Sequence, residues 1–176
     1  MFQPLGIKNY KNEKMFEPKT IDALKWIVDI FNKYNIPYRI GGGFAAKIYG
    51  SPRPLNDIDF GISEKYFPII LPDISKYITF GPARWNSDGK WDCELITLNY
   101  HGQEIDISGT DTSKISNKER TKWIPLADSS TNTLNVNVQG IDVKIMNPRE
   151  LKNYKKELDG EHQLVDIQAI DNYLST

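Results

Sequence analysis

The sequence predicts a single α+β domain, in which a mixed β-sheet carries helices packed on one side and a C-terminal helical pair closes the structure. Three observations support this fold class. Several segments alternate polar and apolar residues, which is the period of a half-buried strand. Segments with helical spacing of apolar residues lie near both ends of the chain. The 176 residues are enough for one core and too few for two ordinary domains.

The N-terminal half begins with a polar segment interrupted by Pro4 and Gly6, which we expect to form an arm over 1–19. Thr20 is the expected cap of the first helix, because apolar residues recur at helical spacing after it. These residues are Ile21, Leu24, Ile27, Val28 and Phe31. A short strand ending at Ile40 then runs into three glycines. The elements predicted after the glycines are a helix over 44–49, a strand over 57–62 and a helix over 64–77.

Two hairpins are predicted in the second half of the chain. The first pairs 94–99 with 103–108, and the second pairs 134–138 with 141–145. The polar segment 109–122 between them is expected to be a surface loop with some helix. Before the first hairpin, a loop over 81–92 concentrates tryptophans. Its aromatic rings either stack on a base or acceptor ring or cap the edge of the sheet.

Two helices are predicted at the C-terminus. Asn147 followed by Pro148 is the favoured order at a helix start, and Gly160 separates the two helices. The apolar residues of the two helix faces are Leu151, Tyr154, Leu158, Leu164, Ile167, Ile170 and Leu174. The predicted organisation is therefore one domain, 1–176, with an arm over 1–19, a catalytic core over 20–146 and C-terminal helices over 147–176.

Composition narrows the class of protein. The formal net charge is −1, which argues against electrostatic binding to long nucleic acid because that needs a strongly basic surface. No apolar run approaches the length that spans a bilayer, and the first residues lack the apolar core of a secretory signal. The single cysteine, Cys93, excludes an internal disulfide and is expected to be a packed residue. We therefore expect a cytoplasmic protein that does not contact a membrane.

The glycine run Gly41-Gly42-Gly43 stands between a predicted strand and a predicted helix. Glycines at such a turn allow the backbone to approach a phosphate closely, and N–H groups at a helix start attract anions. Taken alone the run is more typical of a tight strand-to-helix turn. Its position before the acidic strand favours the phosphate-binding interpretation.

Three aspartates are expected to meet on one face of the sheet. Asp57 and Asp59 alternate along a strand, so their Cα atoms lie about 6.5–7 Å apart on the same side. Asp106 stands between two isoleucines on a later strand and must face the open side as well, whereas Glu104 is expected nearer the rim. Three carboxylates on one face repel each other unless cations lie among them. The pattern predicts a site for divalent metal, with oxygen ligands that suit magnesium.

On these residues the sequence resembles the DNA polymerase β-like nucleotidyltransferase superfamily. Its pattern is Gly-Gly, then Asp-hydrophobic-Asp some residues later, and a third acidic residue on a later strand. The stretch GGGFAAKIYGSPRPLNDIDF is most similar to small bacterial stand-alone enzymes. These are the lincosamide and aminoglycoside nucleotidyltransferases and the nucleotidyltransferase toxins of abortive-infection systems. In the C-terminal segment Tyr154, Lys155 and Asp166 match, whereas Gly160, His162 and Gln163 stand where arginine and lysine-aspartate are common.

The resemblance implies a Mg²⁺-dependent enzyme that moves a nucleoside monophosphate from an NTP to a hydroxyl group and releases pyrophosphate. The residues implied to contact the NTP are Gly41, Gly42, Gly43, Arg53 and Lys155. The catalytic and metal-binding residues implied, for two magnesium ions, are Asp57, Asp59 and Asp106. Asp106 either completes the second metal site or takes the proton of the acceptor hydroxyl.

Several alternatives stay open at the level of sequence. A small-molecule acceptor is favoured, but a tRNA end or a protein side chain, as in a toxin, fits the same chemistry. A non-catalytic nucleotide-binding module would keep the fold without the reaction. For Arg53 the alternative role is a salt bridge to a local carboxylate, and for Lys155 it is solvation on an exposed helix face.

Overall fold

A computed structural model describes residues 9–10, 15–126 and 131–176 of the chain. Most of the predicted arm over 1–19 therefore lies outside the described residues. Within it, Asn9–Tyr10 forms a short strand, β1, that pairs in parallel with β9. The first helix begins at Pro18, so the arm ends slightly earlier than predicted.

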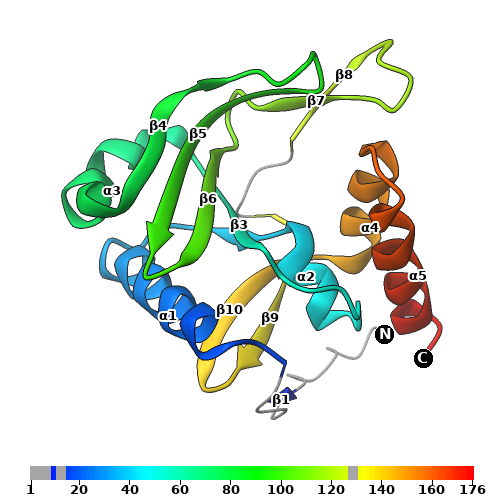
Figure 1. Ribbon diagram of the computed structural model, residues 1–176, viewed down its shortest axis with the longest axis horizontal. Coiled ribbons are helices and arrows are strands. Elements are labelled where there is room, and N and C mark those ends of the chain that lie inside the picture. The colour runs from blue at the N-terminus through cyan, green and yellow to red at the C-terminus, as the bar shows by residue number, and fades with distance from the viewer. Residues whose placement is uncertain (1–8, 11–14, 127–130) are drawn as a thin grey trace.

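The sheet is mixed, as the sequence predicted (Figure 1). Its strands run in the order β1-β9-β10-β2-β3-β6-β5-β7-β8, and β4 pairs with β5 at the side. Three pairs are parallel, β1 with β9, β10 with β2 and β3 with β6. The strand bounds are β2 Arg39–Ile40, β3 Asp57–Ile62, β4 Ile78–Trp85, β5 Trp91–Tyr100, β6 Gln103–Gly109, β7 Lys114–Ser116, β8 Trp123–Pro125, β9 Thr133–Val138 and β10 Ile141–Met146.

Five α-helices accompany the sheet in the part of the chain that the structure describes. They are α1 Pro18–Lys33, α2 Gly42–Ile48, α3 Phe67–Ile74, α4 Pro148–Glu157 and α5 His162–Leu174. Short 3-10 turns flank α3 on both sides, so the helix predicted over 64–77 is present in three pieces. The C-terminal pair α4 and α5 lies side by side and packs against α2 (Figure 1).

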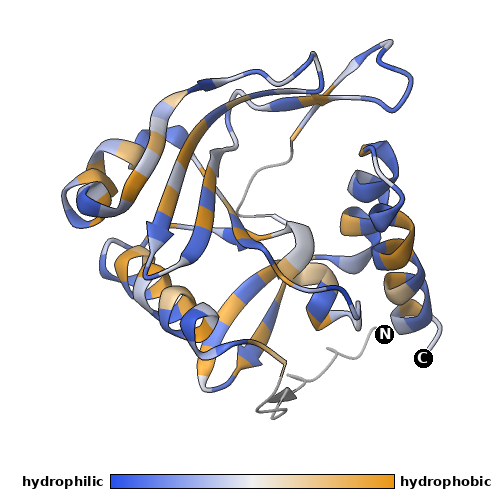
Figure 2. Cartoon of the chain, in the orientation of Figure 1, coloured by the Kyte–Doolittle hydropathy of each residue, from blue (hydrophilic) through white to orange (hydrophobic). Residues whose placement is uncertain are grey.

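The core lies between the apolar face of the sheet and helices α1 and α3. Along β3 the even-numbered residues Ile58, Phe60 and Ile62 are buried, whereas the aspartates between them are half-buried. Phe31 of α1 meets Phe60 at a ring-centroid distance of 5.3 Å. Apolar and polar segments alternate along the central strands (Figure 2). This alternation leaves the acidic side chains on the face opposite the core.

The expected cap at Thr20 is wrong. The helix starts after Glu17 with Pro18 in its first turn, and Thr20 is buried, where its hydroxyl donates a 2.6 Å hydrogen bond to Gln103. A threonine three residues into a helix faces the core here, because residues three and four apart share one side of a helix. The predicted apolar face is otherwise present, with Leu24, Ile27 and Phe31 fully buried.

The tryptophan-rich loop predicted over 81–92 is instead a two-stranded ribbon. β4 and β5 pair antiparallel, with Trp85 opposite Cys93, and the only loop is the tip between the strands. Gly81 and Pro82 lie at an irregularity in the register between Phe80 and Ala83. A bulge lets a strand accept residues that cannot join the regular ladder.

Two further predictions are corrected. The segment 109–122 contains the strand β7 and turns rather than helix, because its backbone pairs with β5 and β8. On α5, the buried residues are Gln163, Asp166, Ala169 and Ile170, whereas Leu164 is 63% exposed. The helix presents a partly polar face to its neighbours, so the apolar pattern alone did not identify the buried side.

Cys93 is buried, as expected, and burial raises the pKa of its thiol to about 11. This excludes a reactive thiolate near neutral pH. Among the described residues, none of the helices combines the length and the apolar composition needed to cross a bilayer.

Candidate active site

The three predicted carboxylates converge. Strands β3 and β6 run in parallel with Asp59 directly beside Asp106, and Asp57 precedes Asp59 on the same face. Each side chain offers one ligand oxygen, and these oxygens all lie within 4.8 Å of one another. The Thr97 hydroxyl donates a 2.7 Å hydrogen bond to Asp106 and so fixes its orientation. Glu104 is exposed two residues earlier on β6, at the rim as predicted.

The electrostatics of the cluster fit a divalent cation. Burial, together with the charges of Asp57 and Asp106, raises the pKa of Asp59 to about 8 against the opposing effects of Lys155 and the Gly43 N–H. Burial also raises the pKa of Asp106 to about 6, although the hydrogen bond from Thr97 opposes the shift. Neighbouring carboxylates disfavour each other's ionisation, and a cation bound between them stabilises the ionised form of all of them. Oxygen ligands of this kind suit magnesium.

A dependence of stability on pH and metal follows from these two pKa values. Both folded-state pKa values exceed the ordinary carboxyl value, so the folded protein holds more protons than the unfolded chain between pH 4 and 8. We therefore expect the metal-free protein to lose stability as pH rises above about 4. The contribution of Asp106 is lost by about pH 6, and that of Asp59 by about pH 8. Thermal unfolding in a chelator should give a midpoint several degrees lower at alkaline than at mildly acidic pH.

Saturating Mg²⁺ should remove most of this loss, because it binds the ionised form. Asp59→Asn should flatten the pH dependence without metal, since an amide does not titrate. A midpoint that rises between mildly acidic and alkaline pH in the chelator would contradict the pKa assignments.

The glycine turn packs directly against Asp59. The Gly41 N–H donates a 2.9 Å hydrogen bond to the Asp59 backbone carbonyl, and Gly42 and Gly43 are the first residues of α2. Gly42 adopts a positive φ of 54°, and a Cβ atom at this position would overlap the Asp59 carboxylate. The close approach of turn and carboxylate therefore requires glycine at position 42 in particular.

Gly42→Ala is expected to displace Asp59 and to reduce Mg²⁺-dependent NTP binding at least tenfold, because both the backbone conformation and the carboxylate position are lost. Gly43→Ala is the matched control. A Cβ atom at position 43 would meet only Leu55, at 3.6 Å, and Gly43 itself has no positive φ. Calorimetric titration of both variants tests this, and equal affinities would show that the turn tolerates a side chain at either position.

A cavity of about 240 Å³ opens on one side of the carboxylates. The glycine turn, the segment before β3 and the two C-terminal helices line it. The lining residues used below are Gly42, Gly43, Arg53, Asp57, Asp59, Trp91, Tyr154, Lys155, His162 and Gln163. Gly41 does not line the cavity. Glycine backbone and two cationic side chains on one side of an acidic cluster are suited to a polyphosphate.

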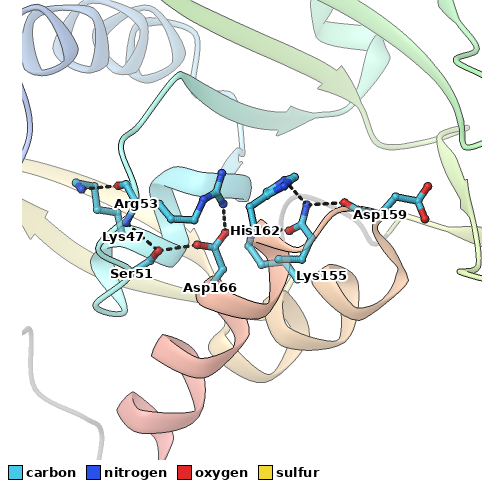
Figure 3. Close-up of polar contacts among 8 residues, drawn as sticks. Lys47, Ser51, Arg53, Lys155, Asp159, His162 and Asp166 are labelled. Carbon is cyan, nitrogen blue, oxygen red and sulfur yellow. Dashed lines mark hydrogen bonds and ion pairs between the residues drawn. The ribbon is translucent and has the colours of Figure 1, made fainter.

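Asp166 of α5 holds the cationic wall of this cavity in place (Figure 3). Its carboxylate accepts hydrogen bonds of 2.6 Å from Arg53 and from Ser51, and it forms an ion pair of 2.7 Å with Lys155. Asp166 is 1% and Lys155 3% exposed. Burial acts to raise the pKa of Asp166, but hydrogen bonds from Lys155 and Ser51 outweigh it and leave the pKa below its ordinary value.

Two sequence alternatives are resolved by this network. Lys155 is buried, so it is not a solvated lysine on an exposed helix face. Arg53 forms the expected kind of salt bridge, although its partner Asp166 lies far away in the sequence, and Arg53 still lines the cavity. His162 and Gln163 belong to the same group of contacts, with Gln163 hydrogen-bonded to both His162 and Lys155.

A second cavity, of about 300 Å³, lies on the other side of the carboxylates. It is lined by Asp59, Phe80, Trp85, Trp91, Cys93, Leu95, Thr97, Glu104, Asp106 and Ser108. Asp59 and Trp91 line both cavities, so the acidic cluster and one indole form the boundary between them. A roomier cavity of about 570 Å³ lies between the end of α1 and β9–β10, but none of the three aspartates lines it.

Lys90 fixes the ribbon that carries Trp91. Its side chain is 5% exposed and donates to the backbone carbonyls of Ser116, Asn117 and Glu157. Glu157 is the last residue of α4, and a cation at the C-terminal end of a helix complements the helix dipole. The contact joins the β4–β5 ribbon to the C-terminal helices and so holds both walls of the first cavity.

Sequence reasoning missed Lys90 and Asp166 as contributors to the site, whereas it did name the tryptophans of 81–92 as candidates for stacking on a base or acceptor ring. Asp166 had a signal, because it matched the C-terminal pattern of the resembled superfamily. Lys90 had none, since its segment was interpreted as a loop.

Comparisons with known proteins agree with this architecture. The structure is similar to a Thermotoga maritima protein assigned as a nucleotidyltransferase, with a TM-score of 0.70 and 16% identity over 94% of this chain and 99% of the other. It is also similar to the lincosamide antibiotic adenylyltransferase LnuA with lincomycin bound, with a TM-score of 0.58 and 13% identity over 86% and 96% of the two chains.

A third similar structure is ANT(2″)-Ia in complex with adenylyl-2″-tobramycin, with a TM-score of 0.57 and 11% identity over 88% of this chain and 89% of the other. No protein-family model and no curated protein matches the sequence. The chain has the nucleotidyltransferase fold, which confirms the fold that the resemblance implied.

Proposed function

We propose that this chain is a Mg²⁺-dependent nucleotidyltransferase that moves a nucleoside monophosphate from an NTP to a hydroxyl group of a small molecule. The observation that carries the proposal is the position of three converging carboxylates between two cavities. One cavity has glycine backbone and cationic side chains, and the other has aromatic and acidic ones. A transfer between two substrates needs this arrangement, with the reacting groups meeting at the carboxylates.

Asp57, Asp59 and Asp106 would hold two magnesium ions. When bound, the metal supplies neutralisation of the triphosphate and of the leaving pyrophosphate. Asp59 suits a shared ligand because it lines both cavities, whereas Asp57 lines only the first and Asp106 only the second. Carboxylates whose pKa values are raised by burial and by one another fit this use, since the cation offsets their repulsion.

The NTP would occupy the first cavity with its phosphates against Gly42 and Gly43, while Gly41 supports the turn through its hydrogen bond to Asp59. Lys155 and Arg53, both held by Asp166, would bind the phosphates as fixed cations. A cation already positioned by a buried partner loses little conformational entropy when it binds a ligand.

In the proposed reaction the acceptor oxygen attacks the α-phosphorus, a new P–O bond forms and the bond to the β-phosphate bridging oxygen breaks. The hydroxyl proton passes to Asp106, which faces the acceptor cavity. The products are the nucleotidylated acceptor and pyrophosphate.

A small acceptor is supported by two structurally similar proteins and by the volume of the second cavity. LnuA and ANT(2″)-Ia, to which this chain is structurally similar, are seen with lincomycin and with adenylyl-2″-tobramycin. The second cavity holds about 300 Å³, which is the low end of small-molecule sites.

The proposal is tested by calorimetric titration of each of the four NTPs, with and without Mg²⁺, into wild type and into the Asp57→Asn/Asp59→Asn double variant. We expect Mg²⁺-dependent binding that the double variant loses. Asp29→Asn is the matched control, because Asp29 pairs with Lys25 on the exposed surface of α1. Binding that is independent of Mg²⁺, or that survives in the double variant, would refute the assignment of the metal site.

A further inference from the structure

One row of side chains crosses four strands from the carboxylates into the second cavity. Asp59 lies beside Asp106, Asp106 lies opposite Thr97, and Thr97 lies opposite Phe80. All four line the second cavity. The reacting centre is therefore continuous with the aromatic part of this face of the sheet.

Along β6 the cavity has an acidic end and an aromatic end. Glu104, Asp106 and Ser108 alternate on one face, so the Cα atoms of Glu104 and Asp106 are about 6.5–7 Å apart. Beyond Ser108, whose partner is Leu95, strand β5 continues to Cys93 and Trp91. Asp106 consequently stands between Glu104 on one side and the tryptophans on the other.

Three aromatic rings line this cavity: the two tryptophans at the aromatic end, and Phe80 in the row of Thr97 and Asp106. The ring centroids of Trp85 and Trp91 are 6.1 Å apart with an interplanar angle of 38°. Phe80 is 40% exposed. Large apolar side chains that line an open cavity gain free energy when a flat apolar group covers them.

The acidic end lacks a counter-ion. Among the described residues, no Lys, Arg or His lines this cavity, and no basic side chain forms an ion pair with Glu104. The nearby cations Arg84 and Lys114 are both paired with Asp92. Two Mg²⁺ ions would pair with the three aspartates, whereas Glu104 is a lining carboxylate outside that cluster.

We propose that the second cavity selects acceptors that carry an apolar ring and an amine on opposite sides of the reacting hydroxyl. The ring lies against Trp85, Trp91 and Phe80, the hydroxyl lies at Asp106, and the ammonium group pairs with Glu104. An anionic acceptor, such as a phosphorylated compound or an RNA end, is repelled at the acidic end. The inference rests on the proposed function, because that function places the acceptor in this cavity.

Three probes that share a phenyl ring and a benzylic hydroxyl group test the charge preference. They are 3-amino-1-phenylpropan-1-ol, its neutral N-acetyl derivative and the anionic 3-hydroxy-3-phenylpropanoate, each with the hydroxyl between the ring and the variable group. Ligand-observed NMR titrations are run with Mg²⁺, in the presence and absence of a non-hydrolysable NTP analogue. We expect the amine to bind about tenfold more tightly than the neutral probe and the carboxylate to bind most weakly.

Three variants separate the two ends of the cavity. Glu104→Gln should equalise the amine and the neutral probe, whereas Trp85→Leu should weaken all three probes and keep the order. Glu94→Gln is the control, because Glu94 lies on the opposite face of β5 and does not line the cavity. Equal affinities in wild type, a preference for the carboxylate, no binding of any probe, or an amine preference that survives Glu104→Gln would each overturn the inference.

The two proposals fail in different ways. Binding of the NTP analogue with Mg²⁺ is measured in the same samples and depends on the first cavity. If the analogue binds and the amine preference is absent, only the inference on the acceptor fails. If the analogue does not bind, the proposed function fails, and the probe titration without nucleotide still reports on the charge preference of the cavity.

Discussion

Asp57→Asn, Asp59→Asn and Asp106→Asn are each expected to reduce nucleotidyl transfer by at least about a thousandfold while the protein stays folded. The three side chains share one small volume, with ligand oxygens within 4.8 Å of one another, so an amide in place of any one weakens the whole cation site. An amide also cannot accept the acceptor proton at position 106. Pyrophosphate release with an amino-alcohol acceptor measures the loss.

The same variants should be at least as stable as wild type in the absence of metal. Burial and mutual repulsion raise the pKa of Asp59 and of Asp106, so each ionised carboxylate costs folding free energy near neutral pH. Thermal unfolding in a chelator should give equal or higher midpoints for Asp59→Asn and Asp106→Asn. Near-normal turnover in any of the three variants would remove that residue from the catalytic group, and a lower midpoint would contradict the electrostatic argument.

Among the variants proposed, Asp166→Leu is expected to lower the free energy of unfolding most, by about 3–5 kcal/mol. It leaves the buried Lys155 and the half-buried Arg53 without their shared counter-ion. Denaturant unfolding monitored by circular dichroism measures the change. Asp171→Asn is the matched control. Asp171 pairs with Lys152 between the same two helices, but its side chain is 40% exposed, and such pairs contribute about 0–1 kcal/mol.

A second variant shows whether the loss comes from the unpaired charge. Lys155→Met/Asp166→Leu removes both members of the most buried pair and replaces them with apolar groups, so it should recover a substantial part of the stability. It should not recover NTP affinity, since the phosphate contact of Lys155 is gone. If the double variant is less stable than Asp166→Leu alone, packing rather than charge explains the role of Asp166.

The local elements of this protein were largely predictable from its sequence. Alternation along 57–62 predicted the strand with its aspartates on one face, and the short gap between 94–99 and 103–108 predicted the turn of the first hairpin. Both signals are local, because side-chain direction in a strand and the backbone conformation of a turn depend on adjacent residues. The convergence of Asp106 with Asp57 and Asp59 followed from the same alternation once the two strands were taken as neighbours.

The errors occurred where tertiary contacts overrode local preference. The segment 81–92 was expected to be a loop, yet the pairing of β4 with β5, with Trp85 opposite Cys93, makes most of it a ribbon. Leu164 fitted the apolar face of its helix, yet Asp166 occupies the buried side because Lys155 and Arg53 satisfy its charge. A hydropathy pattern does not detect a buried ion pair, since the partners are distant in sequence.

The sequence by itself determined the fold class and the face of the strand on which each aspartate lies, because both depend on the alternation of residues within single segments. Only the tertiary structure decided which side of the cluster faces the cations and which faces the aromatic rings. It did so by bringing Trp91, from a ribbon, and Asp166, from the last helix, to opposite walls around the same carboxylates. Burial and pairing of charges are collective properties of the packed chain, and no short segment carries them.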